Sequence, residues 1–182
     1  MARPTRVEIT EVGPRDGLQA EQKFVPTELK IKLINDLVDA GVKRMEFSSF
    51  VSPRAVPQLA DVLDVLNGVD RSKGAVMAAL VPNVKGAIRA AEAGVDEMIV
   101  FVSASESHNK KNVNRTVDES LAGFAQVAKI AEEAKIPVSA AIATSFGCPF
   151  EGNVPAERLG YVAKHFVDFG FKSVALGDTT GM

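Results

Sequence analysis

Short apolar runs alternate along the chain with longer segments in which apolar residues recur every three or four positions. The short runs predict strands, and the longer segments predict amphipathic helices. We expect strands at about Arg6–Val12, Arg44–Phe47, Ala75–Val81, Glu97–Val102, Val138–Ala143 and Ser173–Leu176. We expect helices around Ile31, Ile34, Leu37 and Val38, and at about Val56–Leu66, Val84–Ala93, Val117–Ala134 and Pro155–Phe169. This alternation is typical of βα units around a parallel sheet.

A weak internal repeat supports the same fold class. Gly41, Gly94 and Gly170 each separate an expected helix from the strand that follows, and glycine is the usual residue just past a helix. A repeated helix, stop and strand favours a TIM barrel or an open α/β sheet. A complete barrel takes about 250 residues. With 182 residues and six expected strands, the sequence predicts an incomplete (β/α)8 barrel. We expect residues 1–182 to form a single partial catalytic domain that lacks the last two βα units.

Composition narrows the function classes. The chain is 46% hydrophobic and 24% charged, with a net charge of -2 and a pI near 5.8. Such a balance gives no electrostatic reason to expect nucleic acid or an anionic membrane as a partner. A single cysteine, Cys148, excludes an internal disulfide framework and fits a reducing compartment. Since no apolar run could span a bilayer, the expected location is cytoplasmic.

Small polar or acidic residues follow every expected strand, including Thr144, Ser145 and Cys148 after Val138–Ala143. In parallel α/β folds the reactive groups collect at the carboxyl ends of the strands, so the candidate site is expected there. The residues predicted for it are, in chain order, Arg15, Asp16, Gln19, Glu46, Ser49, Asn83, Ser105, Asp178 and Thr179.

The segment Gly13-Pro14-Arg15-Asp16-Gly17-Leu18-Gln19 carries the strongest signal. Arg15 offers a permanent cationic fork for a carboxylate, thioester oxygen or enolate, and Asp16 offers a hard oxygen ligand to Mg²⁺ or Mn²⁺. An adjacent Arg-Asp pair can also simply close a turn, but the flanking glycines favour a turn built to present both side chains. Glu46 could likewise be a strand carboxylate paired with Arg or Lys, and Asp178 could cap a turn.

Other reactive side chains have weaker claims. We expect His165 to be an ordinary helix residue, whereas His108 and the Lys110-Lys111 pair lie in an expected polar loop. They could meet a substrate or a phosphate, although solvated side chains are the commoner outcome. Cys148 has no evident histidine partner, which favours a structural role over a nucleophilic one.

The Gly13–Gln19 segment resembles the hydroxymethylglutaryl-CoA lyase family of metal-dependent TIM-barrel lyases. The resemblance continues in the family's order through Glu46–Pro53, Pro82–Gly86, Ala104–Glu106, Gly147–Gly152 and Leu176–Thr179. It covers essentially the whole chain as the N-terminal portion of the family.

The resemblance implies a retro-Claisen cleavage of a 3-hydroxy-3-methylglutaryl-CoA-type thioester to acetyl-CoA and acetoacetate, a step of leucine degradation. It implies Asp16 as a ligand of a divalent metal, and Arg15, Glu46 and Asp178 as catalytic residues. It further implies that the substrate, an acyl-CoA, is bound by Arg15, Gln19, Ser49, Asn83, Ser105 and Thr179.

The family's remaining metal ligands, a His-x-His pair and an asparagine, and its late catalytic cysteine have no counterpart here. We therefore expect this chain not to catalyse the reaction by itself. Two alternatives stay open: a non-catalytic fragment or subunit that acts by association, including as a homodimer, and a lyase for a different branched hydroxyacyl-CoA.

Overall fold

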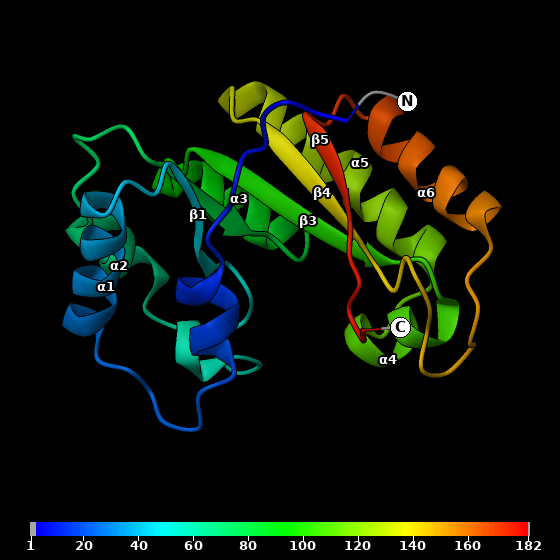
Figure 1. The fold of residues 1–182 in the computed structure, drawn as a ribbon, viewed down its shortest axis with the longest axis horizontal. Coiled ribbons are helices and arrows are strands. Elements are labelled where there is room, and N and C mark those ends of the chain that lie inside the picture. The colour runs from blue at the N-terminus through cyan, green and yellow to red at the C-terminus, as the bar shows by residue number, and fades with distance from the viewer. Residues whose placement is uncertain (1–2, 182) are drawn as a thin grey trace. The chain divides into compact units, whose positions relative to one another are not determined.

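The computed structural model describes residues 3–181, in which helices and strands alternate along the chain (Figure 1). Met1, Ala2 and Met182 lie outside the described residues, and so do the ends of the predicted domain 1–182. Contacts divide the chain into two compact units, the first ending at Leu80 and the second beginning at Val81. That residues 1–182 form a single domain stays a prediction.

The first unit contains one parallel strand pair with two helices. Its elements are the π-helical turn η1 (Gly13–Gly17), α1 (Thr27–Asp39), β1 (Arg44–Ser49), the 3-10 turn η2 (Pro57–Leu59), α2 (Val62–Gly68) and β2 (Val76–Leu80). Arg44 lies opposite Val76, and Ser49 opposite Leu80. Helix α2 packs against both α1 and β1. The core consists mainly of Ile34, Met45, Phe47, Val62, Val65 and Met77.

The second unit contains three parallel strands with four helices. Its elements are α3 (Val84–Ala93), β3 (Glu97–Ser103), α4 (Glu106–Val113), α5 (Val117–Ala134), β4 (Val138–Ala143), α6 (Ala156–Asp168) and β5 (Ser173–Leu176). Strand β4 pairs in parallel with both β3 and β5. Helix α5 packs on β3, and α6 packs on β4. The core includes Met98, Val100, Val127, Ile142, Val162 and Phe166.

Much of the predicted element order is confirmed. Five of the six expected strands form, and the helices expected over Val84–Ala93 and Val117–Ala134 have the predicted bounds. Gly41, Gly94 and Gly170 have φ values of 98°, 70° and 77°. These left-handed conformations are easy for glycine, so the repeat reflects a real helix stop. No helix among residues 3–181 is long and apolar enough to cross a membrane.

The predicted strand Arg6–Val12 is wrong. Within it only Glu11 joins a β-bridge, to Met45, and Val7 and Ile9 are 73% and 79% exposed. An alternating apolar sequence becomes a strand only when a neighbouring backbone pairs with it. Before Glu11, this segment has no ladder partner among the described residues.

Three predictions about helical segments also need correction. The single helix expected over Val56–Leu66 is divided into η2 and α2, because the backbone at Asp61 is not helical (φ -93°, ψ 20°). The polar loop expected around His108 is instead helix α4, whose N-cap Ser105 accepts a hydrogen bond from the His108 N–H. Ser105 supplies a capping signal that the apolar periodicity did not reveal. The helix predicted to start at Pro155 starts one residue later, because Pro155 is the N-cap of α6 (Ala156–Asp168).

Candidate active site

The turn η1 is fixed to β1 by backbone hydrogen bonds on both sides of Glu11. The Glu11 N–H donates to the Arg44 carbonyl at 3.0 Å, and the Glu46 N–H donates to the Glu11 carbonyl at 2.8 Å. The Glu11 carboxylate also accepts the Gly13 N–H at 2.6 Å. Since these bonds tie the start of the turn to the strand that carries Glu46, Arg15 and Glu46 come together.

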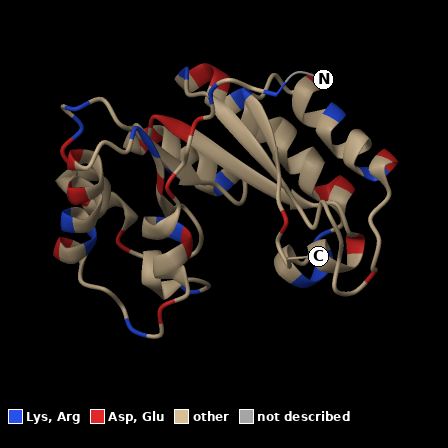
Figure 2. Ribbon diagram, in the orientation of Figure 1, with Lys and Arg blue, Asp and Glu red and all other residues tan. Residues whose placement is uncertain are grey.

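Arg15 lies between two carboxylates at this turn. Its Nε and Nη2 atoms lie 2.7 Å and 2.5 Å from Oε2 of Glu46, and its Nη1 atom lies 2.5 Å from Oδ1 of Asp16. The side chains of Arg15 and Glu46 are 16% and 12% exposed, whereas that of Asp16 is 63% exposed. Both signs of charge accordingly appear on η1 in Figure 2. The buried side of the guanidinium is neutralised, and its solvent side holds a replaceable partner.

The other predicted residues of the first unit differ in accessibility. Gln19 is exposed just past η1, whereas Ser49 is fully buried. The Ser49 hydroxyl donates to the Leu80 carbonyl at 3.3 Å and accepts the Val51 N–H at 3.2 Å. A β-bulge between Glu46 and Ser48 interrupts the register with β2. Bulges often occur next to active sites, where they change the direction of a side chain. Ser49 thus has an established structural use, while its role in substrate binding stays a prediction.

The remaining predicted residues belong to the second unit. Asn83 and Ser105 are the N-caps of α3 and α4, and their side chains accept backbone N–H groups of those helices. Asp178 and Thr179 are exposed in the segment after β5. The Thr179 Oγ1 atom accepts the Thr144 N–H at 2.9 Å. The structure therefore groups Arg15, Asp16 and Glu46 in one unit, and it places Asp178 beside Thr179 in the other.

A divalent metal fits these residues only in part. Asp16 supplies an accessible carboxylate, but one of its oxygens is paired with Arg15. No group of three or more His, Cys, Asp or Glu side chains that could hold a metal occurs within residues 3–181. Mg²⁺ is usually bound through one or two protein carboxylates together with several waters, so Asp16 fits as one contributing ligand.

The histidines and the cysteine have defined partners. His165 lies in α6 as expected, with Nδ1 2.9 Å from the Tyr161 carbonyl oxygen. Nδ1 of His108 lies 2.6 Å from the buried Ser103 hydroxyl. Cys148 is fully buried, and its thiol donates to the Ser105 hydroxyl at 3.0 Å. This burial fits the structural role expected for Cys148.

Glu11, which supports Gly13, was not among the residues predicted for the site, although it precedes the motif by two residues. Thr144 is one of the polar residues that follow the strand Val138–Ala143 in the sequence, but its backbone N–H contact with Thr179 depends on backbone geometry that no residue pattern specifies.

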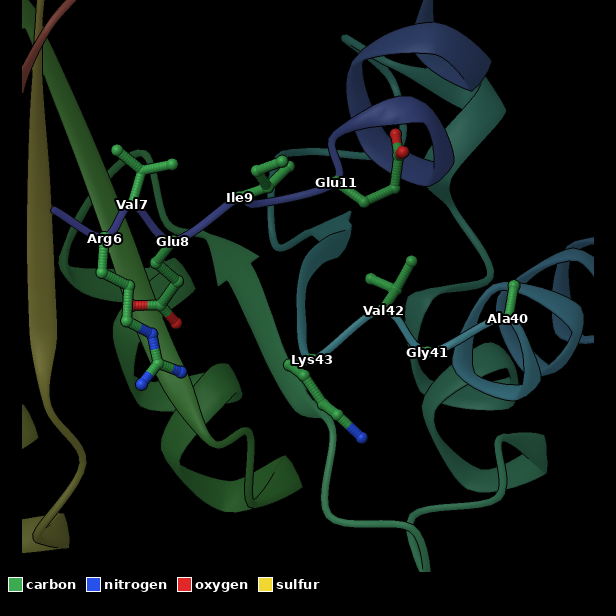
Figure 3. A pocket seen from close by; sticks show the side chains of 9 residues that line it. All are labelled: Arg6, Val7, Glu8, Ile9, Glu11, Ala40, Gly41, Val42 and Lys43. Carbon is green, nitrogen blue, oxygen red and sulfur yellow. The ribbon is translucent and has the colours of Figure 1, made fainter.

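A cavity of about 820 Å³ in the first unit contains none of the predicted site residues. Figure 3 shows it between the extended segment Arg6–Glu11 and the loop Ala40–Lys43. It opens beside the segment that fails to pair as a strand, and it lies at the amino end of β1. Because parallel α/β folds place their chemistry at the carboxyl ends of the strands, we assign no catalytic role to this cavity.

Parallel strands joined by helices, with Arg15 on the turn η1 paired to Glu46 on β1, define a protein of the α/β class. The family model described as HMGL-like matches residues 6–182. The chain belongs to the HMGL-like family.

Named relatives agree with this assignment. The chain is 46% identical over 181 residues to hydroxymethylglutaryl-CoA lyase YngG of Bacillus subtilis, covering 100% of this chain and 60% of the relative. It is 43% identical to the human mitochondrial hydroxymethylglutaryl-CoA lyase, covering 98% of this chain and 55% of the relative. The chain therefore spans about three-fifths of the length of these relatives.

Solved structures support the fold. The Bacillus subtilis HMG-CoA lyase superposes with a TM-score of 0.95 at 46% identity, over 100% of this chain and 61% of that one. An HMG-CoA lyase from Acinetobacter baumannii, in complex with coenzyme A and 3-methylmalate, has a TM-score of 0.92 at 42% identity, over 96% and 57% of the two chains. The predicted fold class, an incomplete TIM barrel, is confirmed.

Proposed function

We propose that this chain carries part of the active site of a carbon–carbon lyase that cleaves 3-hydroxy-3-methylglutaryl-CoA to acetyl-CoA and acetoacetate. The observation that carries the proposal is the Arg15 guanidinium, held on its buried side by Glu46 and paired on its solvent side with the exposed Asp16. A fixed cation with one replaceable contact suits an anion that forms only during the reaction.

The reaction needs such a cation at one step. The tertiary hydroxyl loses its proton, and the resulting alkoxide becomes the ketone of acetoacetate. The electron pair of the breaking carbon–carbon bond moves to the α-carbon of the thioester, which leaves as an enolate. Proton addition to that carbon then gives acetyl-CoA. In the proposal, the Nη1 side of Arg15 exchanges Asp16 for the enolate oxygen, while Glu46 keeps the guanidinium oriented.

Three further features of the proposal concern ligands and location. Members of the family generally depend on a divalent metal, and Asp16 is the residue through which this chain would contribute to Mg²⁺ or Mn²⁺ binding. An acyl-CoA substrate is supported by the relative solved with coenzyme A. Gln19, Ser49, Asn83, Ser105 and Thr179 are proposed to contact it, and Asp178 to take part in catalysis. A cytoplasmic location and a role in leucine degradation are proposed with the activity.

The experiment joins this chain to the part of Bacillus subtilis YngG that lies beyond the match, because the chain covers 60% of that relative. The chimera is incubated with 3-hydroxy-3-methylglutaryl-CoA and Mg²⁺, and both products are quantified. We expect equal amounts of acetyl-CoA and acetoacetate. A folded chimera that cleaves only a longer branched hydroxyacyl-CoA would instead establish the alternative substrate. A folded chimera with neither activity would exclude the proposal.

A second candidate function, association without catalysis, is favoured by the exposed edge of the second unit. Strand β5 pairs with β4 on one side, and Leu176 on it is 51% exposed. Unpaired strand edges and exposed apolar side chains promote association. Light scattering after size-exclusion chromatography tests this candidate. Self-association predicts a homodimer, and a chain that stays monomeric at all concentrations excludes it.

A further inference from the structure

Thr144 has an unusual backbone conformation directly after β4. Its φ is 56°, and three non-glycine residues within the described range have positive φ: Asn114, Lys135 and Thr144. Asn114 and Lys135 are the C-caps of α4 and α5, where a left-handed residue is ordinary. Thr144 instead follows a strand, is fully buried and is β-branched, so its conformation is a true outlier. Such residues concentrate at functional sites.

The side chain of Thr144 does not explain its left-handed backbone conformation. Its hydroxyl donates to the adjacent Ala143 carbonyl at 2.7 Å, so it folds back on its own strand. The backbone N–H of Thr144 donates to Oγ1 of Thr179 at 2.9 Å. Thr144 therefore contacts Thr179 through its main chain and not through its side chain.

Neighbouring backbone bonds fix the segment after β5 in place. The Gly177 N–H donates to the Ile142 carbonyl at 2.8 Å, and the Ser145 N–H donates to the Gly177 carbonyl at 3.1 Å. These bonds extend the β4–β5 pairing past the strand ends and hold the backbone that leads to Thr179. The Thr144 N–H then fixes the Thr179 side chain itself.

This contact sets the direction of the Thr179 hydroxyl. A hydroxyl group whose oxygen accepts a backbone N–H can still donate its own proton to another acceptor. Thr179 is exposed, so its hydroxyl can donate to a ligand. We propose that Thr144 is a positioning residue whose left-handed backbone holds the Thr179 hydroxyl as an outward hydrogen-bond donor. With the proposed function, on which this last step rests, the acceptor is a carbonyl or carboxylate oxygen of the hydroxyacyl-CoA.

The geometric part is tested without any ligand, by amide hydrogen exchange of the full chain. Thr179→Val removes the acceptor, whereas Thr179→Ser keeps it. We expect exchange of the Thr144 amide to be about tenfold faster in Thr179→Val and to return to the wild-type rate in Thr179→Ser. The Ser145 amide, bonded to the Gly177 carbonyl, is the matched control and should not change. Unchanged Thr144 exchange in Thr179→Val, or equal acceleration at Ser145, overturns the inference.

The functional part is tested by calorimetric binding of 3-hydroxy-3-methylglutaryl-CoA to the chain. Thr144→Gly keeps the N–H and tolerates positive φ but loosens the restraint. We expect it to unfold at an equal or higher temperature and to bind about fivefold more weakly, with Thr179→Ser binding better than Thr179→Val. If the wild type, Thr144→Gly and Thr179→Val all bind 3-hydroxy-3-methylglutaryl-CoA with equal affinity, the role of Thr179 in substrate binding is overturned. A wild-type chain that binds no thioester, with the exchange pattern intact, contradicts the proposed function and leaves the Thr144–Thr179 positioning established.

Discussion

Arg15 shows how one residue can be both structural and poised for chemistry. Its two contacts with Glu46 are largely shielded from solvent, and its contact with Asp16 faces outward. Arg-to-carboxylate pairing is strongest when a planar guanidinium presents several donors, so Glu46 is the more persistent partner. Asp16 is the partner that Arg15 would release when the Asp16 carboxylate binds a metal or when a substrate oxygen takes its place.

Asp16→Asn separates a metal ligand from a simple ion-pair partner. The exposed pair should contribute under about 1 kcal/mol to the free energy of unfolding, measured by urea denaturation. If Asp16 is a metal ligand, Mn²⁺ affinity, followed by electron paramagnetic resonance, should fall about tenfold or more. Asp36→Asn is the matched control, because Asp36 also forms an exposed ion pair, with Lys32. Equal Mn²⁺ affinity in the two variants would argue against the ligand role.

At the scale of elements, a buried ion pair joins α1 to the segment before α2. Lys30 is 3% exposed, and its Nζ contacts Oδ1 of Asp61 at 2.7 Å and the Gln58 carbonyl at 2.5 Å. Thr27 donates to the other oxygen of Asp61 at 2.7 Å. These bonds hold Asp61, the non-helical residue between η2 and α2, against α1.

Lys30→Ala should therefore be strongly destabilising. Removing one partner leaves the Asp61 carboxylate buried without its charge partner, which costs about 3 kcal/mol of unfolding free energy or more. Lys32→Ala, on the same helix but with 67% side-chain exposure, should cost only about 0.5 kcal/mol. Urea denaturation of both variants measures the difference. Similar losses would show that the buried pair contributes no more than a surface pair.

A second element-scale prediction concerns acid stability at the start of α4. Glu151 accepts the Ser107 N–H at 2.6 Å, and hydrogen bonding from Ser107 is the main cause that lowers the pKa of the Glu151 carboxyl below its ordinary 4.5. Because the folded-state pKa is the lower one, the unfolded chain takes up this proton first. The associated stability is present above about pH 4.5 and is lost as the pH falls through the folded-state pKa.

The measurement is thermal unfolding of the wild type and Glu151→Gln between about pH 6 and pH 3. The variant should lose less stability over this range, since it cannot bind the proton. Parallel curves for the two proteins would contradict the assignment.

For the whole molecule, the sequence predicted more of the fold than of the site. Buried strands such as Val138–Ala143 carry enough apolar signal to be located without a structure. The strand predicted over residues 6–12 does not form, because a strand needs a neighbouring backbone to pair with. Helix α4 was not predicted because its sequence, Glu-Ser-His-Asn-Lys-Lys-Asn-Val, lacks an apolar face.

Within the site, the sequence raised an Arg15–Asp16 pair and an Arg or Lys partner for Glu46, but it did not identify Arg15 as the partner of both carboxylates. The pairing depends on the bridge that Glu11 forms with Met45, which no residue pattern specified. The left-handed backbone of Thr144 was equally invisible, because threonine rarely adopts it.

The central claim is that Arg15 stabilises an enolate formed by carbon–carbon bond cleavage. The most direct test is the rate of acetyl-CoA release from 3-hydroxy-3-methylglutaryl-CoA by the chimera with YngG, compared between Arg15 and Arg15→Gln. Thermal unfolding first verifies that both proteins are folded. The account predicts that kcat falls by about 10²–10³-fold, as for the loss of other donors to a developing oxyanion. A folded Arg15→Gln chimera that releases acetyl-CoA within about twofold of the parent rate would contradict it.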